Sequence, residues 1–181
     1  MRTTNFYRGR LPHWEVDRGV YFVTLRLAGT LPRQVVDRLR ELSKEAEQAP
    51  RDRWLDIQRR IFFALEEALD AGGSIDYLSR PMVAKMVISA VETRVKRGDW
   101  NAIEYVLMPN HLHMFLELRK GTLFSQMVSF KRWTTRHGRQ ILGLGAKAFW
   151  QREWFDHWPR SEQEDLRIAK YIRDNPIKGG L

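Results

Sequence analysis

The sequence predicts an α+β fold, in which a ferredoxin-like antiparallel sheet carries helices on one face and a further helix follows at the C-terminus. Segments rich in β-branched and aromatic residues alternate with segments of helical periodicity. The central segments follow the order strand, helix, strand, strand, helix, strand, which is the order of a ferredoxin-like domain. A length of 181 residues suits one such domain, and we expect it to span residues 1–181.

The first half of the chain is predicted to hold one strand and three helical segments. Prolines open or interrupt the helices, because proline is tolerated in the first helical turn but not inside a helix. Glycines end them, as expected for helix C-caps. The predicted elements are a strand over 20–28, a helix from Pro32 to the interruption at Pro50, a second that ends at Gly72–Gly73, and a third from Pro81 to Gly98.

The second half is predicted to begin with a β-hairpin, formed by residues 100–108 and 111–118 and joined through Pro109-Asn110. Two further helices carry N-terminal capping signals, because a hydroxyl that precedes a helix accepts a hydrogen bond from a free backbone N–H group. The predicted elements are a helix capped by Thr122, an aromatic strand over 149–158, and a last helix over about 162–175 that has Ser161 and Glu164 as a capping box and is ended by Pro176.

The net charge of +9 and the isoelectric point near 10.2 indicate a polyanionic partner such as nucleic acid. The excess is local: residues 119–160 hold nine Lys or Arg against two acidic residues. The chain has no cysteine, which excludes disulfides and thiolate metal sites. Without an apolar segment of membrane-spanning length or a secretory signal at the N-terminus, we expect a cytoplasmic, nucleoid-associated protein.

Two histidines stand two positions apart in the segment HLHMFLEL. Because side chains of a strand alternate between its faces, Leu112 and Met114 are predicted to face the core. His111 and His113 then project together from the opposite, open face, where one cation could bridge them. The alternative, that an exposed strand face simply carries polar residues, is equally compatible with the segment.

The last predicted helix contains a second candidate pair in the segment YIRDNP. Tyr171 and Asn175 are four residues apart, so the phenol and the carboxamide lie on one helical face. A tyrosine hydroxyl is a weak nucleophile near pH 7 and needs a polarised electrophile or a base. Mg²⁺ or Mn²⁺ held by two imidazoles and an amide oxygen could polarise a phosphate for it. The alternative is that Tyr171 packs at the helix end and Asn175 caps it.

Taken together, VLMPNHLHMFLEL with the basic helix after it, FWQREWFDHWPRSEQ and YIRDNPIKGGL resemble the REP-associated tyrosine transposases. These are single-tyrosine HUH transposases, named for a motif of histidine, bulky hydrophobic residue and histidine. The resemblance covers nearly the whole chain and implies that Tyr171 is the nucleophile and that His111, His113 and Asn175 hold a divalent cation, Mg²⁺ or Mn²⁺. It also implies an HUH endonuclease fold and nicking of hairpin-flanked single-stranded DNA, such as REP-like palindromes, through a covalent 5′-phosphotyrosine.

The basic and aromatic side chains between the two motifs are candidates for DNA contact. Arginines that repeat with helical spacing are expected to follow a DNA backbone, and tryptophans are expected to stack on bases. For the tryptophans, core packing is an equally good interpretation. The candidates are Lys131, Arg132, Arg136, Arg139, Trp150, Arg152 and Trp154.

Two functions of other classes stay open from the sequence: a non-catalytic DNA-hairpin binding regulator and a metal hydrolase of small phosphoesters. The chain has no phosphate-binding G-x-x-x-x-G-K-[ST] loop, which strand transfer through a tyrosyl ester does not need. The sequence given ends at Leu181, whereas many relatives continue. If the additional segment of those relatives helps to read the hairpin, specificity is expected to be reduced or differently placed here. Either a monomer or a homodimer is compatible with the sequence.

Overall fold

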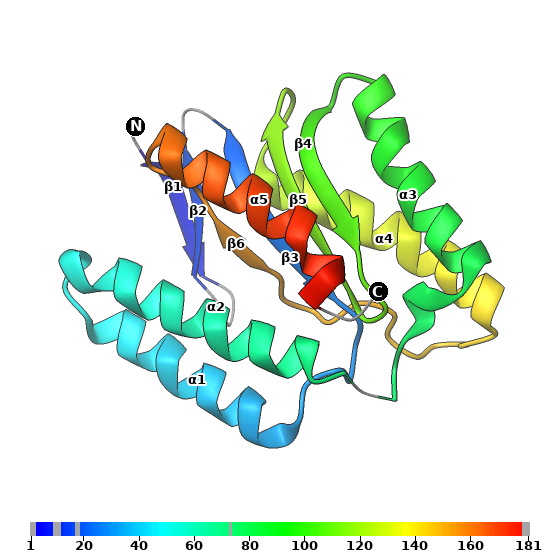
Figure 1. Ribbon diagram of the computed structural model, residues 1–181, viewed down its shortest axis with the longest axis horizontal. Coiled ribbons are helices and arrows are strands. Elements are labelled where there is room, and N and C mark those ends of the chain that lie inside the picture. Colours follow the sequence, from blue (N-terminus) through cyan, green and yellow to red (C-terminus); the bar gives the residue numbers. More distant parts are fainter. Residues whose placement is uncertain (1–2, 9–11, 17–18, 73, 179–181) are drawn as a thin grey trace.

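The computed structural model describes residues 3–8, 12–16, 19–72 and 74–178. A four-stranded antiparallel sheet forms its centre and helices lie on both sides of it (Figure 1). The elements in chain order are β1 (Thr3–Arg8), β2 (Pro12–Val16), β3 (Val20–Arg26), α1 (Arg33–Gln48), α2 (Trp54–Asp70), α3 (Pro81–Lys96), β4 (Trp100–Leu107), β5 (His111–Leu118), α4 (Leu123–Leu142), β6 (Phe155–His157) and α5 (Glu162–Lys178), with short 3₁₀ turns at Arg51–Arg53 and Tyr77–Ser79.

The sheet order β4-β5-β3-β6 confirms the ferredoxin-like prediction. The two strands that are central in space, β3 and β5, pair over their whole lengths, with Thr24 opposite His113 and Arg26 opposite His111. Strand β6 adds to the free edge of β3 and β4 adds to that of β5. The histidine segment therefore lies in the middle of the sheet, where its backbone is fixed from both sides.

One face of the sheet is covered by α3 and α4. The predicted apolar face of β5 is confirmed, since Leu112, Met114 and Leu116 pack there against Val87 of α3 and Phe130 of α4. Thr122 caps α4 as predicted and forms a capping box with Ser125. Burial of this many aliphatic and aromatic side chains is the main stabilising contribution to such a layer.

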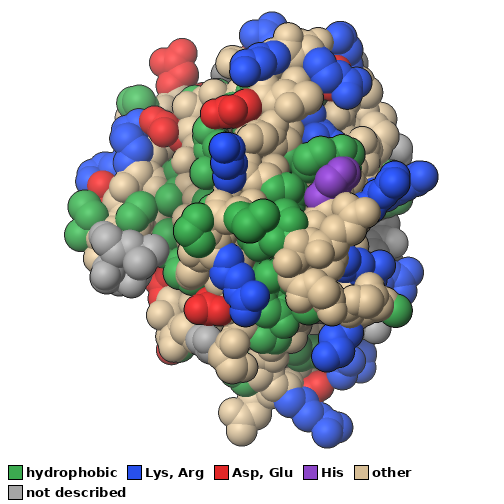
Figure 2. All heavy atoms as spheres, turned by 90° about the vertical axis from the view of Figure 1, so that its right-hand side faces the viewer, with side chains coloured by type: hydrophobic (Ala, Val, Ile, Leu, Met, Phe, Trp, Pro, Cys, Tyr) green, Lys and Arg blue, Asp and Glu red, His purple; other side chains and the backbone are tan. Residues whose placement is uncertain are grey.

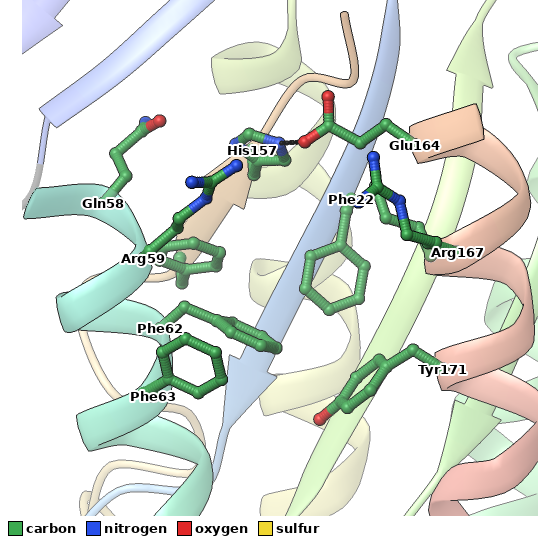
Figure 3. A pocket seen from close by; sticks show the side chains of 11 residues that line it. Phe22, Gln58, Arg59, Phe62, Phe63, His157, Glu164, Arg167 and Tyr171 are labelled. Carbon is green, nitrogen blue, oxygen red and sulfur yellow. Dashed lines mark hydrogen bonds and ion pairs between the residues drawn. The ribbon is translucent and has the colours of Figure 1, made fainter. Parts of the chain in front are cut away.

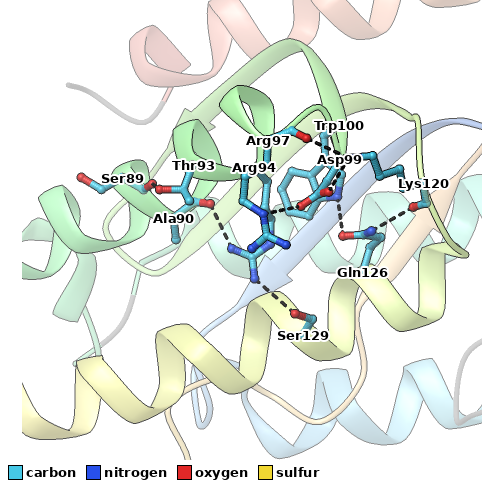
Figure 4. Close-up of polar contacts among 10 residues, drawn as sticks. All are labelled: Ser89, Ala90, Thr93, Arg94, Arg97, Asp99, Trp100, Lys120, Gln126 and Ser129. Carbon is cyan, nitrogen blue, oxygen red and sulfur yellow. Dashed lines mark hydrogen bonds and ion pairs between the residues drawn. The ribbon is translucent and has the colours of Figure 1, made fainter.

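The two helices of this face are also joined by a polar cluster at the end of α3 (Figure 4). The Arg94 side chain is buried, donates to the Ala90 carbonyl (3.0 Å) and lies over the ring of Trp100, 5.4 Å from its centroid. Trp100 Nε1 donates to Gln126 Oε1 of α4 (3.0 Å), and Gln126 donates to the Lys120 carbonyl (2.8 Å). These contacts fix the β5–α4 turn relative to α3.

The opposite face is covered as well, which corrects the expectation of helices on one face only. Helix α2 and helix α5 pack there against Phe22 and Phe115, and α1 packs on α2. In Figure 1, α5 runs in front of the sheet while α4 lies behind it. The second layer arises because α1 and α2 form a helical hairpin whose apolar stripe, with Ile57, Ile61 and Leu65, needs a surface to cover.

Three features of the fold differ from the prediction. The hairpin of β1 and β2 was not anticipated, and it is tied to β6 through the buried contact between His13 and Asp156. The predicted strand over 149–158 is reduced to β6 and an isolated bridge between Leu27 and Trp150. Helix α5 continues past Pro176 to Lys178, because a proline near a helix end removes little hydrogen bonding.

Candidate active site

Strand β5 carries His111 and His113 on the face of the sheet that α2 and α5 cover. The two imidazoles lie side by side, with ring centroids 4.4 Å apart, as the HxH spacing predicts. The expectation of an open sheet face is wrong, since His111 is 1% and His113 0% exposed. Burial excludes the interpretation of the pair as polar residues of a solvated strand face.

Each imidazole is held through its Nδ1 atom. Thr24 Oγ1, from the neighbouring strand β3, lies 2.9 Å from His113 Nδ1, and Asn110 Oδ1 lies 2.5 Å from His111 Nδ1. We assign the proton of His111 to Nδ1, because the Asn110 oxygen can only accept a hydrogen bond. The Thr24 hydroxyl can donate or accept, so His113 can carry its proton on either nitrogen. The Nε2 atoms of both rings are buried without a hydrogen bond. His111 Nε2 therefore presents a lone pair, and His113 Nε2 presents a second one in the tautomer that donates from Nδ1 to Thr24, the arrangement of metal-binding histidines.

Burial keeps both imidazoles neutral. It lowers the pKa of His113 to about 3, against a smaller opposing effect of Asp70. Burial also lowers the pKa of His111 well below its usual value, the neighbouring His113 lowers it further, and contact with Asn175 opposes the shift. Neutral imidazole is the form that binds a cation, so no proton has to leave at pH 7 before binding.

Helix α5 brings Tyr171 and Asn175 to this pair. The Tyr171 ring lies 5.6 Å from that of His113, and Asn175 Nδ2 donates to the Tyr171 hydroxyl oxygen (3.1 Å). Asn175 is 1% exposed and its Oδ1 atom has no hydrogen bond. The predicted face of the helix is confirmed, and its phenol, its amide oxygen and both histidine Nε2 atoms lie together. The cap interpretation of Asn175 does not hold, since the helix continues past it.

Glu66 of α2 is part of the same group, although it belongs to none of the motifs in the sequence. Its carboxylate accepts a hydrogen bond from the Tyr171 hydroxyl, and Oε2 lies 3.3 Å from His113 Nε2. The sequence feature that could have indicated Glu66 is its position four residues after Phe62, which places a carboxylate beside the apolar stripe of α2. Without the placement of α2 over the sheet, nothing in the sequence connects this carboxylate with a residue more than a hundred positions later.

The donor set fits a divalent cation. Among the described residues, no group of three or more His, Cys, Asp or Glu side chains is arranged to hold a metal ion. The candidate ligands are instead two imidazoles and one amide, and their buried atoms His111 Nε2, His113 Nε2 and Asn175 Oδ1 all lack a hydrogen bond. Buried polar atoms are rarely left without partners, so a group that binds all three would remove an energetic cost.

The tryptophans proposed for DNA contact lie in the core. Trp150 is 5% and Trp154 4% exposed, and the Trp150 indole donates to Thr134 Oγ1 (2.8 Å). Trp154 packs at 4.8 Å between ring centroids against His13. Neither ring can stack on a base in this position, so the core-packing interpretation replaces the prediction. Trp133 of α4, which was not proposed, is the exposed tryptophan of this region, with 41% exposure.

The proposed basic residues fall into two groups. Lys131 is half-buried, donates to the carbonyls of Gln151 and Arg152, and has a pKa that burial lowers to about 8, despite Glu153. Arg139 donates to the Ala146 and Lys147 carbonyls and so holds the turn after α4. Both therefore have a structural role that the prediction of DNA contact did not include. Arg132, Arg136 and Arg152 are exposed.

Replacing Trp150 with Ala is expected to lower the free energy of unfolding by about 3–5 kcal/mol, because it leaves a cavity and removes the partner of Thr134. The matched control is Trp133→Ala, for which the exposed ring predicts a change of roughly 0.5 kcal/mol or less. Urea denaturation followed by circular dichroism measures both. Equal losses for the two variants would contradict the assignment of Trp150 to the core.

Comparison with known proteins decides the family. A family model described as transposase IS200-like matches residues 76–175, more than half of the chain. The chain belongs to the IS200-like transposase family. An uncharacterized protein of Haemophilus influenzae is 31% identical to it over 41% of this chain and 53% of that protein, so the chain matches about half the length of this relative. The family resemblance derived from the motifs is thereby confirmed.

A solved structure of a REP-associated tyrosine transposase bound to a REP hairpin shares the fold of this chain. The superposition has a TM-score of 0.55 and covers 96% of this chain and 73% of that one, at 18% sequence identity. The family match contains His111, His113, Tyr171 and Asn175, whereas α1, α2 and thus Glu66 precede it. Among the residues of this chain that the structure describes, no helix combines the length and apolar character needed to cross a membrane.

Stability of the metal-free protein is expected to fall as the pH falls below 6.5. The unfolded chain binds a proton on His113 near pH 6.5, whereas the folded chain does so only near pH 3. Stability therefore rises with pH across that interval, by about 1.4 kcal/mol per pH unit for this residue. Denaturation in EDTA at several pH values measures it, with His113→Asn as the comparison. Identical slopes for both proteins would show that His113 titrates normally in the folded state.

Proposed function

We propose that this chain nicks single-stranded DNA at hairpin-bearing sites and rejoins the strands through a covalent bond to Tyr171. The observation that carries the proposal is the meeting of three buried, hydrogen-bond-free donor atoms with one tyrosine hydroxyl. His111, His113 and Asn175 would hold a divalent cation, Mg²⁺ or Mn²⁺. When bound, that cation would polarise a phosphate oxygen of the DNA.

The residues of the chain account for the remaining chemistry. Tyr171 oxygen attacks the phosphorus, the bond to the 3′ oxygen breaks, and the products are a 5′-phosphotyrosine and a free 3′-OH. Glu66 already accepts the hydrogen bond of the phenol, so its carboxylate is placed to orient the hydroxyl and to take its proton. The tyrosyl ester keeps the energy of the broken bond, and attack by a 3′-OH reverses the step, which joins strands without a nucleotide cofactor.

Hairpin DNA as the substrate is supported by the charge of the chain and by the solved relative. That relative is a REP-associated tyrosine transposase bound to a REP hairpin, and it has the same fold. The exposed side of α4 adds Arg132 and Arg136 beside Trp133, which stacks on His137 with ring centroids 3.9 Å apart. Arginine binds phosphate and aromatic rings stack on bases. An enzyme that acts on chromosomal palindromes would work in the cytoplasm, at the nucleoid.

The direct test is the covalent intermediate. The protein is incubated with Mn²⁺ or Mg²⁺ and a hairpin oligonucleotide from the DNA that flanks its gene, labelled at the 3′ end. The label should migrate with the protein on a denaturing gel, and a shorter 5′ fragment with a 3′-OH should appear. Metal-independent binding without any adduct would instead support the non-catalytic regulator.

Replacing Arg132 and Arg136 together with Gln is expected to weaken hairpin binding and to reduce its salt dependence. Each lost phosphate contact lowers the slope of log K against log salt by roughly 0.7 to 0.9. Fluorescence anisotropy between 50 and 200 mM salt measures this. The control is Arg33→Gln on α1, a side chain that is 95% exposed and distant in sequence from the basic segment. An unchanged slope would mean that α4 does not contact the phosphates.

A further inference from the structure

A pocket of about 260 Å³ lies between α2 and α5, directly beside the active site (Figure 3). Phe62 and Phe63 of α2 form one wall, α5 forms the other, and strands β3 and β6 close the back. Tyr171 lines the pocket with its ring, while its hydroxyl is bonded to Glu66 and Asn175 of the active site. A DNA strand with a phosphate at Tyr171 would therefore pass the mouth of this pocket.

Aromatic rings dominate the walls. Phe22, Phe62 and Phe155 are packed against one another, with centroids 5.5 to 6.3 Å apart, and Tyr171 meets Phe62 at 5.5 Å. Phe63 is different, since it is 65% exposed at the rim. The volume is close to the lower limit of small-molecule sites, roughly 300 Å³. A flat aromatic group the size of one nucleobase suits such a space better than a longer chain.

The charges at the mouth select an anion. Arg59 of α2 and Arg167 of α5 both point into the pocket from its opposite walls (Figure 3). Both are exposed, and among the residues that the structure describes neither forms an ion pair; Arg167 Nε donates to the Gln163 carbonyl (3.2 Å). The acid of the pocket, Glu164, is engaged by His157 (2.9 Å) and by the Arg160 N–H (2.8 Å). A purely apolar occupant would leave two guanidinium groups unmatched.

We propose that this pocket is a nucleobase subsite, which takes one unpaired base of the DNA strand next to the phosphate attacked by Tyr171. The base stacks on Phe63 and Phe62, and Arg59 and Arg167 bind the phosphates on either side of it. The inference rests on the proposed function, because it assumes that the strand reaches Tyr171. It assigns α2 a part in choosing which DNA segment enters the site.

Binding without chemistry tests the subsite. Fluorescence anisotropy in EDTA is measured with the hairpin oligonucleotide and its single-stranded flank, intact or with one base of the flank removed at each position in turn. Removal of one particular base should weaken wild-type binding roughly tenfold, in the range of stacking on an aromatic side chain. Phe63→Ala should weaken binding of the intact oligonucleotide to the same extent and should be insensitive to removal of that base.

The control for Phe63→Ala is Met82→Ala, which removes an apolar side chain that is 70% exposed on α3. The control for Arg59→Gln is Arg33→Gln on α1, which replaces a side chain that is 95% exposed. Both controls should bind like wild type, whereas Arg59→Gln should bind several-fold more weakly. If base removal and Phe63→Ala act additively, or if Phe63→Ala binds like wild type, the subsite is overturned. A wild-type protein that shows this coupling but never forms the adduct would overturn the proposed function and leave the subsite intact.

Discussion

Tyr171→Phe is expected to reduce formation of the covalent protein–DNA adduct by at least about 10³-fold, the scale of losing a nucleophile. The substitution removes one oxygen and keeps the ring, whose edge contacts with Phe22 and Phe62 stabilise α5 on the sheet. Hairpin binding should therefore stay within about twofold of wild type, because no cation or phosphate contact is lost. The loss of adduct would then be chemical and not a failure to fold.

The assay uses the 3′-labelled hairpin oligonucleotide with Mn²⁺ and a denaturing gel. Tyr105→Phe is the control, since Tyr105 lies on β4, is 37% exposed and has the same hydroxyl removed. It should form the adduct at the wild-type rate. If Tyr171→Phe still forms the adduct, another residue is the nucleophile and the assignment of the site is wrong.

Replacing His111 and His113 together with Ala is expected to abolish both Mn²⁺ binding and nicking. In wild type, Mn²⁺ at 100 times its dissociation constant should raise the free energy of unfolding by about 2.7 kcal/mol, since only the folded chain assembles the ligands. The variant should gain nothing from the metal. Because both imidazoles are held neutral in the folded chain, their removal leaves no buried charge without a partner, and the variant should still fold.

Calorimetric titration with Mn²⁺ and thermal unfolding with and without it measure these effects independently of activity. His157→Ala serves as the control, because His157 pairs with Glu164 and lies away from the histidine pair. It should bind Mn²⁺ like wild type. Binding of Mn²⁺ by the double variant with wild-type affinity, or nicking by wild type in EDTA, would contradict the proposed metal site.

The sequence predicted those parts of the site that lie within one element. Alternation along β5 put both histidines on one face, and helical spacing put Tyr171 beside Asn175, because these relations depend only on local backbone geometry. Which helix covers which face of the sheet is a tertiary relation. Glu66 could not be connected with Tyr171 before α2 was placed, and the burial of the histidines could not be distinguished from exposure.

The burial of Trp150 and Trp154 is a second tertiary relation that the sequence did not predict. A Trp-Arg-Trp alternation fits a base-stacking surface as well as a packed edge of the sheet, since both require large aromatic rings. Trp150 and Trp154 are buried because the segment crosses under α4 beside the short strand β6 and does not form a long strand of its own. The glycine and proline content of the segment does not indicate that the strand is short. The hydrogen bond from the Trp150 indole to Thr134 of α4 shows that the ring is part of the core.

The helical hairpin of α1 and α2 carries residues of the pocket, whereas β5 and α5 carry the proposed ligands and the nucleophile. The proposed ligands and nucleophile lie on β5 and α5, inside the segment shared with the family, whereas the hairpin precedes that segment and roofs the site. It contributes Glu66 to the tyrosine and Phe62, Phe63 and Arg59 to the neighbouring pocket. The proposed base subsite implies that substitutions at Phe62, Phe63 and Arg59 change which strand is accepted and leave Tyr171 and the proposed ligands unchanged. Exchange of this hairpin between relatives, with the glutamate at position 66 kept, would be a route to new target preference with an inherited reaction.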